Sequence, residues 1–142
     1  MDDVDAAPTA GIVGCLLVLL VLAVPYLLVD ETSAVGAYYG AGAITPLAAG
    51  LFALVGVIVF AAGREERSDP ALVAGAGLVF GLFIFLICTL WAVTIPGSVA
   101  VQLGTASDVA ATVLEGHRWV LAAVSAVVPV AAGWYARVLR LL

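Results

Sequence analysis

The sequence predicts an all-α, polytopic membrane protein, a four-transmembrane-helix bundle with short loops. The composition is 65 % hydrophobic and only 11 % charged, with a mean hydropathy of +1.24. Soluble domains are about 45–50 % apolar, so this chain has too little polar surface to cover a water-soluble core. The charged residues also gather at the ends and in a few short segments, with long uncharged runs between them.

The densest charged segment, Gly63 to Pro70, reads GREERSDP and separates two uncharged runs. One run precedes it, from Ile44 to Ala62, and one follows it, from Ala71 to Ile95. At about 1.5 Å per helical residue, each run is long enough to cross a hydrocarbon core of about 30 Å. The segment is therefore predicted to be a tight loop in water between spans at about 44–62 and 71–95.

The chain opens with an acidic segment, residues 1–10, which we predict to be a cytoplasmic tail. It carries aspartates where a secretory signal peptide would be basic, so the next segment is expected to be retained. That segment predicts a first span at about 11–29, within a single membrane domain over 11–142. Thr9 is a candidate N-cap for this span, and Pro25 is expected to kink or loosen its last turn.

The segment of about 30–43 is small and glycine-rich and predicts a loop, part of which lies flat on the lipid headgroups. Its tyrosine pair, Tyr38 and Tyr39, is expected at the membrane surface. Pro46 suits the first turn of the second span. Asp69 followed by Pro70 is a typical helix start and is expected to begin the third span.

The third span carries two pairs of small residues at four-residue spacing: Gly77 with Gly81, and Ala71 with Gly75. Small residues at this spacing share a helix face and let a neighbouring backbone approach closely, so these four are candidate helix-packing residues. The chain has 15 glycines in 142 residues, and chance spacing is the competing explanation. Both interpretations stay open on the sequence alone.

The polar segment of about 96–118 predicts a short amphipathic helix ending near Glu115, on the membrane or against the bundle. Gly116 is expected to break this helix, and a fourth span follows at about 119–139. An aromatic pair and two arginines close the span, a pattern typical of a membrane exit: Trp134, Tyr135, Arg137 and Arg140.

Arginine placement predicts the orientation. Four spans put both termini and the 63–70 loop on one side of the membrane. That side holds four arginines, Arg64, Arg67, Arg137 and Arg140, and the other side holds only Arg118. Because basic residues favour the cytoplasmic side and acids count for little, both termini are expected in the cytoplasm of a multi-pass cell-membrane protein.

The charged residues comprise arginines without lysine and an excess of acids, which suggests a salt-loving source because a high net charge keeps surfaces soluble. The middle of the chain reads AYYG at 37–40, GLFALV at 50–55 and GREERSDP at 63–70. Over about residues 37–95 it resembles an uncharacterised family of small four-helix (tetraspan) integral membrane proteins of haloarchaea. The resemblance implies a fold and a habitat, and it carries no catalytic motif.

Few residues are candidates for chemistry. The single histidine belongs to a weak outer polar cluster: Asp108, Glu115, His117 and Arg118. A haem held by two histidines cannot be built from one. Glu115, His117 and Asp108 would together offer zinc three ligands, but their spacing matches no known motif. We favour ordinary interfacial polar residues over a metal or proton site. No metal or other cofactor is expected.

The predicted span cores contain no Asp, Glu, Lys, Arg or His, whereas pumps and proton-coupled transporters need such groups at depth. Cys15 and Cys88 are expected at different depths, too far apart for a disulfide. No base stands beside a serine or cysteine in any span, so the protein is not expected to be an enzyme. The composition also lacks a basic footprint for nucleic acid.

Two functions from different classes fit these observations. The favoured one is a structural or accessory membrane protein that packs, within the lipid bilayer, against copies of itself or another membrane protein. The alternative is a channel or carrier for a small or neutral solute, framed between subunits. A haloarchaeal virus envelope is as compatible with the sequence as a cell membrane.

Overall fold

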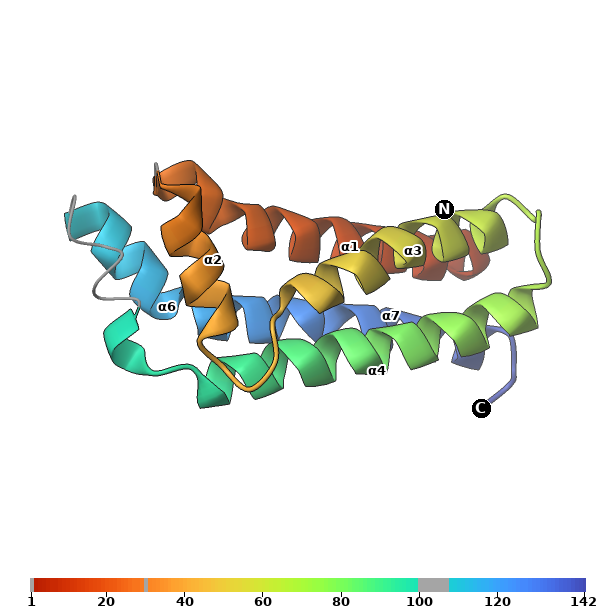
Figure 1. Cartoon of the computed structure of the whole chain (residues 1–142). Helices are drawn as coiled ribbons and strands as arrows, with labels where there is room; N and C mark the ends of the chain where they lie inside the picture. Colours follow the sequence, from red (N-terminus) through yellow and green to blue (C-terminus); the bar gives the residue numbers. More distant parts are fainter. Residues whose placement is uncertain (1, 30, 100–107) are drawn as a thin grey trace.

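The computed structural model describes residues 2–29, 31–99 and 108–142, and these residues form helices joined by short connections (Figure 1). The helices follow one another along the chain as α1 (Asp3–Leu28), α2 (Thr32–Gly40), α3 (Leu47–Arg64), α4 (Pro70–Thr94), α6 (Asp108–Ser125) and α7 (Val127–Val138).

Four helical segments are long and apolar enough to span a membrane: Asp3–Leu28, Leu47–Arg64, Pro70–Thr94 and Ala111–Val138, the last combining α6 and α7. They form one bundle in which α1 packs on α3 and α7, and α4 packs on the same two helices. Both termini and the α3–α4 loop lie at one end, and α2 lies at the other (Figure 1). The predicted all-helical fold with four such segments is confirmed.

The α3–α4 hairpin is built largely as its sequence indicates. Asp69 caps α4, because its side chain accepts a hydrogen bond from the Ala71 amide at 3.2 Å, and Pro70 follows in the first turn. At the other side of the loop α3 ends in a Schellman motif, with Arg67 N–H bonded to the Ala62 carbonyl. Glu66 takes the left-handed position of that motif with φ of 59°, a place that usually holds glycine.

The first helix begins earlier than predicted. The helix starts at Asp3 rather than near residue 11, so most of the expected tail is helical. Thr9 lies inside the helix and does not cap it: its hydroxyl donates to the Asp5 carbonyl at 2.7 Å. The same oxygen accepts from Arg64 Nε at 2.8 Å and joins α1 to the end of α3.

The fourth membrane-length segment also differs from its prediction. Gly116 does not break it, because α6 runs without interruption from Asp108 to Ser125. The interruption falls at Ala126 instead, between α6 and α7. Its physical reason is Pro129, which has no N–H to donate to the carbonyl four residues earlier.

The bundle interior is closely packed through glycines. The Phe60 ring lies between α1 and α4 so tightly that a Cβ on Gly11 or Gly77 would come within 2.6 or 2.8 Å of it. A Cβ on Gly81 would come within 2.7 Å of the Pro129 backbone nitrogen. Large apolar side chains cover the outer surface of the bundle. Ile58 and Leu72 are examples, and each is 67 % exposed.

Candidate functional site

The strongest polar feature of the interior lies at the end of the bundle opposite the termini, and it starts from a proline. Pro25 lies inside α1, and because proline has no N–H, the Val21 carbonyl four residues earlier loses its helical partner. A buried carbonyl without a partner is costly. His117 of α6 satisfies it, with Nε2 at 2.7 Å from the Val21 oxygen.

Helix α2 brings two tyrosines to the same place. Val35, Tyr38 and Tyr39 share one face at helical spacing, and all three are buried. Tyr39 donates its hydroxyl to the Leu22 carbonyl of α1, and the Tyr38 hydroxyl lies 2.9 Å from Nδ1 of His117. The tyrosine pair is therefore buried inside the protein, at the end of the bundle, and its position at the membrane surface stays a prediction.

These contacts define the tautomer of His117. A carbonyl oxygen can only accept, so Nε2 carries the proton that is donated to Val21. In the neutral ring Nδ1 is then the acceptor for the Tyr38 hydroxyl. Both ring nitrogens of a side chain that is only 3 % exposed are thus satisfied. The structure fits a neutral imidazole.

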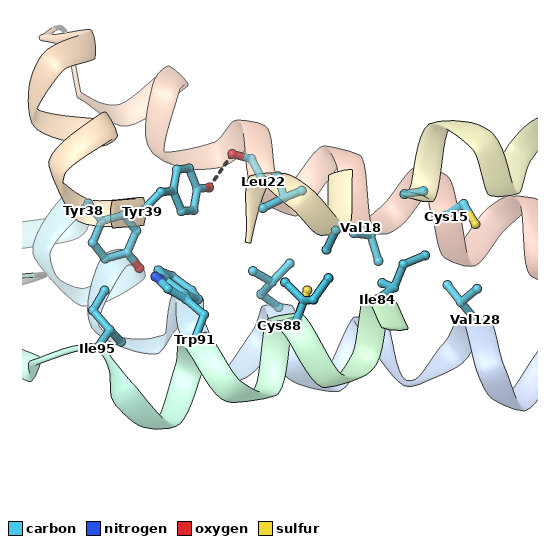
Figure 2. Close-up of a cluster of buried hydrophobic side chains, with 14 of the residues drawn as sticks. Cys15, Val18, Leu22, Tyr38, Tyr39, Ile84, Cys88, Trp91, Ile95 and Val128 are labelled. Atoms are coloured by element: carbon cyan, nitrogen blue, oxygen red, sulfur yellow. Dashed lines mark hydrogen bonds between the residues drawn. The ribbon is translucent and has the colours of Figure 1, made fainter. Parts of the chain in front are cut away.

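Trp91 of α4 forms the floor of the cluster (Figure 2). Its ring meets Tyr38 edge to face, with centroids 5.2 Å apart and an interplanar angle of 86°, and lies 5.5 Å from Tyr39. Its centroid is 6.0 Å from that of His117. Aromatic pairs of this geometry contribute about 0.5–1.5 kcal/mol beyond their buried area. We call Tyr38, Tyr39, Trp91 and His117 the aromatic–histidine cluster.

Two further hydrogen bonds connect the segments that surround the cluster. Thr94 Oγ1 accepts from the Ala43 amide at 2.9 Å, which joins the connection after α2 to the end of α4. Arg118 Nη1 donates to the Ile95 carbonyl at 3.0 Å, where a cation suits the negative end of the helix dipole. The Arg118 guanidinium also lies over the Trp119 ring, 5.0 Å from its centroid.

In the weak outer polar cluster predicted around His117, two described members bond to partners outside the cluster. His117 bonds to a tyrosine and a carbonyl, Arg118 to a carbonyl, and Glu115 is exposed. The side chain of Asp108 lies outside the described residues. Within the described part of the chain, no three His, Cys, Asp or Glu side chains come together as a metal site would require. His117 itself is buried.

The four helix-packing candidates divide into two pairs. Gly77 and Gly81 face the interior, where they receive Phe60 of α3 and the α7 backbone around Pro129. Ala71 and Gly75 are exposed, and a Cβ on Gly75 would meet nothing within 4 Å. The first pair therefore packs within this chain, and only the second is open to another molecule.

The predicted membrane-exit residues are also divided. Trp134 is 38 % exposed, whereas Tyr135 is fully buried beside Gly63 and Val73. The Tyr135 hydroxyl has no hydrogen-bond partner among the described residues. The arginines at this end, Arg64, Arg67, Arg137 and Arg140, are all exposed, and Arg67 pairs with Glu65 at 2.9 Å.

The side chains of the aromatic–histidine cluster are uncharged at neutral pH, and its tyrosines and histidine are hydrogen-bonded. Burial raises the pKa of the Tyr38 phenol, and the positive charge of Arg118 offsets part of the rise. Burial raises the pKa of Tyr39 as well. Both phenols are therefore protonated at neutral pH. The two cysteines are buried, free thiols, with Cys15 against Gly56 and neither in the cluster.

Sequence reasoning missed this cluster, although one signal pointed to it. Pro25 predicts an unpartnered carbonyl in the first span, and a buried unpartnered carbonyl requires a donor from elsewhere in the chain. The lone histidine was the natural donor to seek.

Comparison with known protein families identifies a match. The sequence model of a family of unknown function (DUF7548) matches residues 1–140. No curated protein and no solved structure matches the chain.

Proposed function

Because the chain belongs to DUF7548, a family of unknown function, we propose its role from its own structure: it is a structural or accessory integral membrane protein. It acts through its outer surface, by packing in the bilayer against copies of itself or another membrane protein. The observation that carries this proposal is a filled interior. The core between the helices is occupied by apolar side chains from every membrane-length segment, and the aromatic–histidine cluster covers one end.

The buried polar groups support the same role. Apart from tyrosine and tryptophan, the buried polar or charged side chains among the described residues are His117 and Ser125. Ser125 donates to the Ala122 carbonyl at 2.7 Å, and His117 is satisfied by Val21 and Tyr38. Transport of ions or protons through a membrane protein generally needs ionisable groups along the path. The interior of one chain offers a scaffold instead.

The outer side of α4 has a surface suited to packing against a second helix. Leu72 and Val79 flank the exposed small residues Ala71 and Gly75 on the outer side of α4. Small residues on a lipid-facing helix permit close approach of a second helix. We assign the assembly contact to this face of α4, since Gly77 and Gly81 are already used inside the chain.

The proposal includes a location and an orientation. The protein lies in a cell membrane with both termini in the cytoplasm. Support comes from the exposed arginines, because four of them lie at the end that holds the termini and the α3–α4 loop. The lysine-free, acidic composition supports a salt-loving, haloarchaeal source.

The test is the native mass of the protein, extracted at high salt in mild detergent, with every co-purifying chain identified. We expect a homo-oligomer or a fixed ratio with one other membrane protein, and a Gly75→Leu variant should shift the mass toward the single chain. Gly133→Leu is the matched control, because Gly133 is also open to its surroundings but lies on α7. A single chain in all three samples, without a partner, would contradict the proposal.

A second measurement separates the alternative function. Purified oligomer in vesicles should show no flux of small neutral solutes above protein-free vesicles. Flux that disappears together with the oligomer in Gly75→Leu would favour a channel or carrier framed between subunits over a structural protein.

A further inference from the structure

Helix α2 lies crosswise at the end of the bundle opposite the termini (Figure 1). Its inner face carries the buried Val35, Tyr38 and Tyr39. Its outer face carries Gly36 and Gly40, which are exposed and have open space around them. Since no described residue covers it from outside, α2 stays in place only through the contacts of its inner face and its connections.

Among the described residues, three hydrogen bonds join α2 and the connection after it to the rest of the bundle, and each goes to a different helix. Tyr39 donates to the Leu22 carbonyl of α1, the Ala43 amide after α2 donates to Thr94 of α4, and Tyr38 bonds His117 of α6. The acceptors of the first two bonds, the Leu22 carbonyl and the Thr94 hydroxyl, do not titrate near neutral pH. The third depends on the protonation of an imidazole.

We propose that α2 is an acid-released cap, held closed by neutral His117 and loosened when His117 takes up a proton. In the closed state Nδ1 of His117 is the acceptor for the buried Tyr38 hydroxyl. Protonation turns Nδ1 into a donor, while Nε2 still donates to Val21. The Tyr38 hydroxyl then loses its acceptor.

The Trp91 indole cannot replace it as an acceptor. Figure 2 shows the indole nitrogen of Trp91 on the side of the ring that faces the Tyr38 hydroxyl, and that nitrogen is itself a donor without a partner among the described residues. After protonation, the Nδ1–H can donate to the Tyr38 oxygen, which leaves the phenol hydrogen and the indole N–H without an acceptor among the described residues. Buried donors without acceptors are costly, and lifting α2 into water satisfies Tyr38.

The charged and titratable surroundings do not neutralise an imidazolium within the described residues. From α2, Tyr38 and Tyr39 face the ring, and both are neutral phenols. From α4 the facing group is Trp91, which does not titrate. From α1 it is the Val21 carbonyl. On α6 itself Glu115 is exposed and Arg118 is a cation bonded to Ile95.

The direction of the effect follows from these contacts. A buried histidine that is neutral in the closed state must become charged in acid, so acid favours the open state. Loss of one buried acceptor shifts a local opening equilibrium by about tenfold. With the termini in the cytoplasm, the cap would respond to the pH outside the cell.

Hydrogen exchange of the full-length protein in lipid nanodiscs tests this inference at pH 7.5 and pH 5, with rates corrected for intrinsic exchange. We expect amides of residues 31–43 to exchange about tenfold faster at pH 5, while amides in the middle of α4 do not change. His117→Gln should abolish the pH response, because glutamine keeps a donor and an acceptor but does not titrate. Equal exchange at both pH values, or acceleration spread over the whole bundle, would overturn the cap.

A second reporter does not depend on the folding of the His117 variant. Trp119→Phe with Trp134→Phe leaves Trp91 as the only tryptophan, and Trp91 is fully buried in the closed state. Quenching of its fluorescence by acrylamide should rise several-fold at pH 5 relative to pH 7.5. Unchanged quenching would contradict release of α2.

Discussion

At the scale of single residues, two glycines of α4 that look alike in the sequence have opposite surroundings. Gly81 lies against the backbone of Pro129, and Gly75 lies in open space. A backbone neighbour cannot move aside as a flexible side chain can. The close approach of α4 and α7 therefore depends on the missing Cβ of Gly81.

We expect Gly81→Ala to lower the free energy of unfolding by about 1–3 kcal/mol, the usual cost of overpacking. Gly75→Ala should leave it unchanged or raise it by up to about 1 kcal/mol, because alanine is the better helix former. Unfolding in a graded detergent series, followed by circular dichroism, measures both. Equal effects of the two substitutions would show that the α4–α7 approach is not the reason for a glycine at position 81.

The two buried tyrosines make the stability sensitive to base. Burial raises the pKa of Tyr38 and Tyr39 in the folded state, whereas in the unfolded chain a phenol ionises near its ordinary value of about 10. The neutral phenols therefore contribute stability in full below about pH 10, and this contribution is lost as the pH rises beyond it.

We expect the free energy of unfolding to fall between about pH 10 and pH 12, with tyrosinate absorbance lagging in the folded protein. Tyr39→Phe is the matched variant, since it keeps the ring and removes one ionisable group. Its alkaline loss should be smaller than that of the wild type. A phenylalanine variant with the same alkaline loss would assign the effect to other groups.

The pairing of Tyr38 with His117 shows why single residues were hard to assign from the sequence. The two lie 79 positions apart, and each has a plausible local explanation, a tyrosine or a histidine at a membrane interface. Nothing in either neighbourhood specifies the partner. Only the fold brings the phenol of α2 to the imidazole of α6.

At the scale of elements, the proline of α1 does more than bend a helix. By removing one N–H, Pro25 leaves the Val21 carbonyl to His117. The hydrogen bond that α1 lacks at Val21 is thus replaced by a hydrogen bond from α6. The same logic explains the interruption at Ala126, which precedes Pro129 in the fourth membrane-length segment.

Pro25→Ala should restore a backbone N–H for Val21 and compete with His117 for its carbonyl. We expect faster hydrogen exchange in residues 31–43 at neutral pH, together with slower exchange around residue 25, as α1 gains a helical bond. Pro8→Ala, at the opposite end of the same helix, is the control and should leave α2 unchanged. If exchange in 31–43 is the same in both variants and the wild type, Val21 does not anchor the cluster through His117.

The long elements could be predicted from the sequence, and the short ones could not. Uncharged runs of membrane length and the Asp69-Pro70 start are strong local signals, and they located α3 and α4 to within a few residues. Helix α2 has small residues and two tyrosines that resemble an interfacial loop. Gly116 stays helical because its neighbours α1 and α4 pack along α6, a tertiary effect that outweighs the preference of glycine.

At the scale of the whole molecule, the two ends of the bundle differ in chemistry. The end with the termini is charged: Arg64 bonds Thr9 across helices, and Arg67 pairs with Glu65. The opposite end is a neutral aromatic seal in which Arg118 is tied to Ile95. We propose that the arginines at the end with the termini set the direction of the bundle in a membrane.

Single-cysteine labelling tests that direction in a background where Cys15 and Cys88 are replaced by alanine. Gly97→Cys places a thiol at the sealed end, where the residue is exposed and has open space. Ser68→Cys places one in the exposed α3–α4 loop. Because arginines favour the cytoplasmic side, we expect a membrane-impermeant maleimide to label Gly97→Cys on intact cells. Ser68→Cys should react only after permeabilisation; the reverse pattern would invert the orientation, and equal labelling of both thiols on intact cells would contradict a spanning bundle.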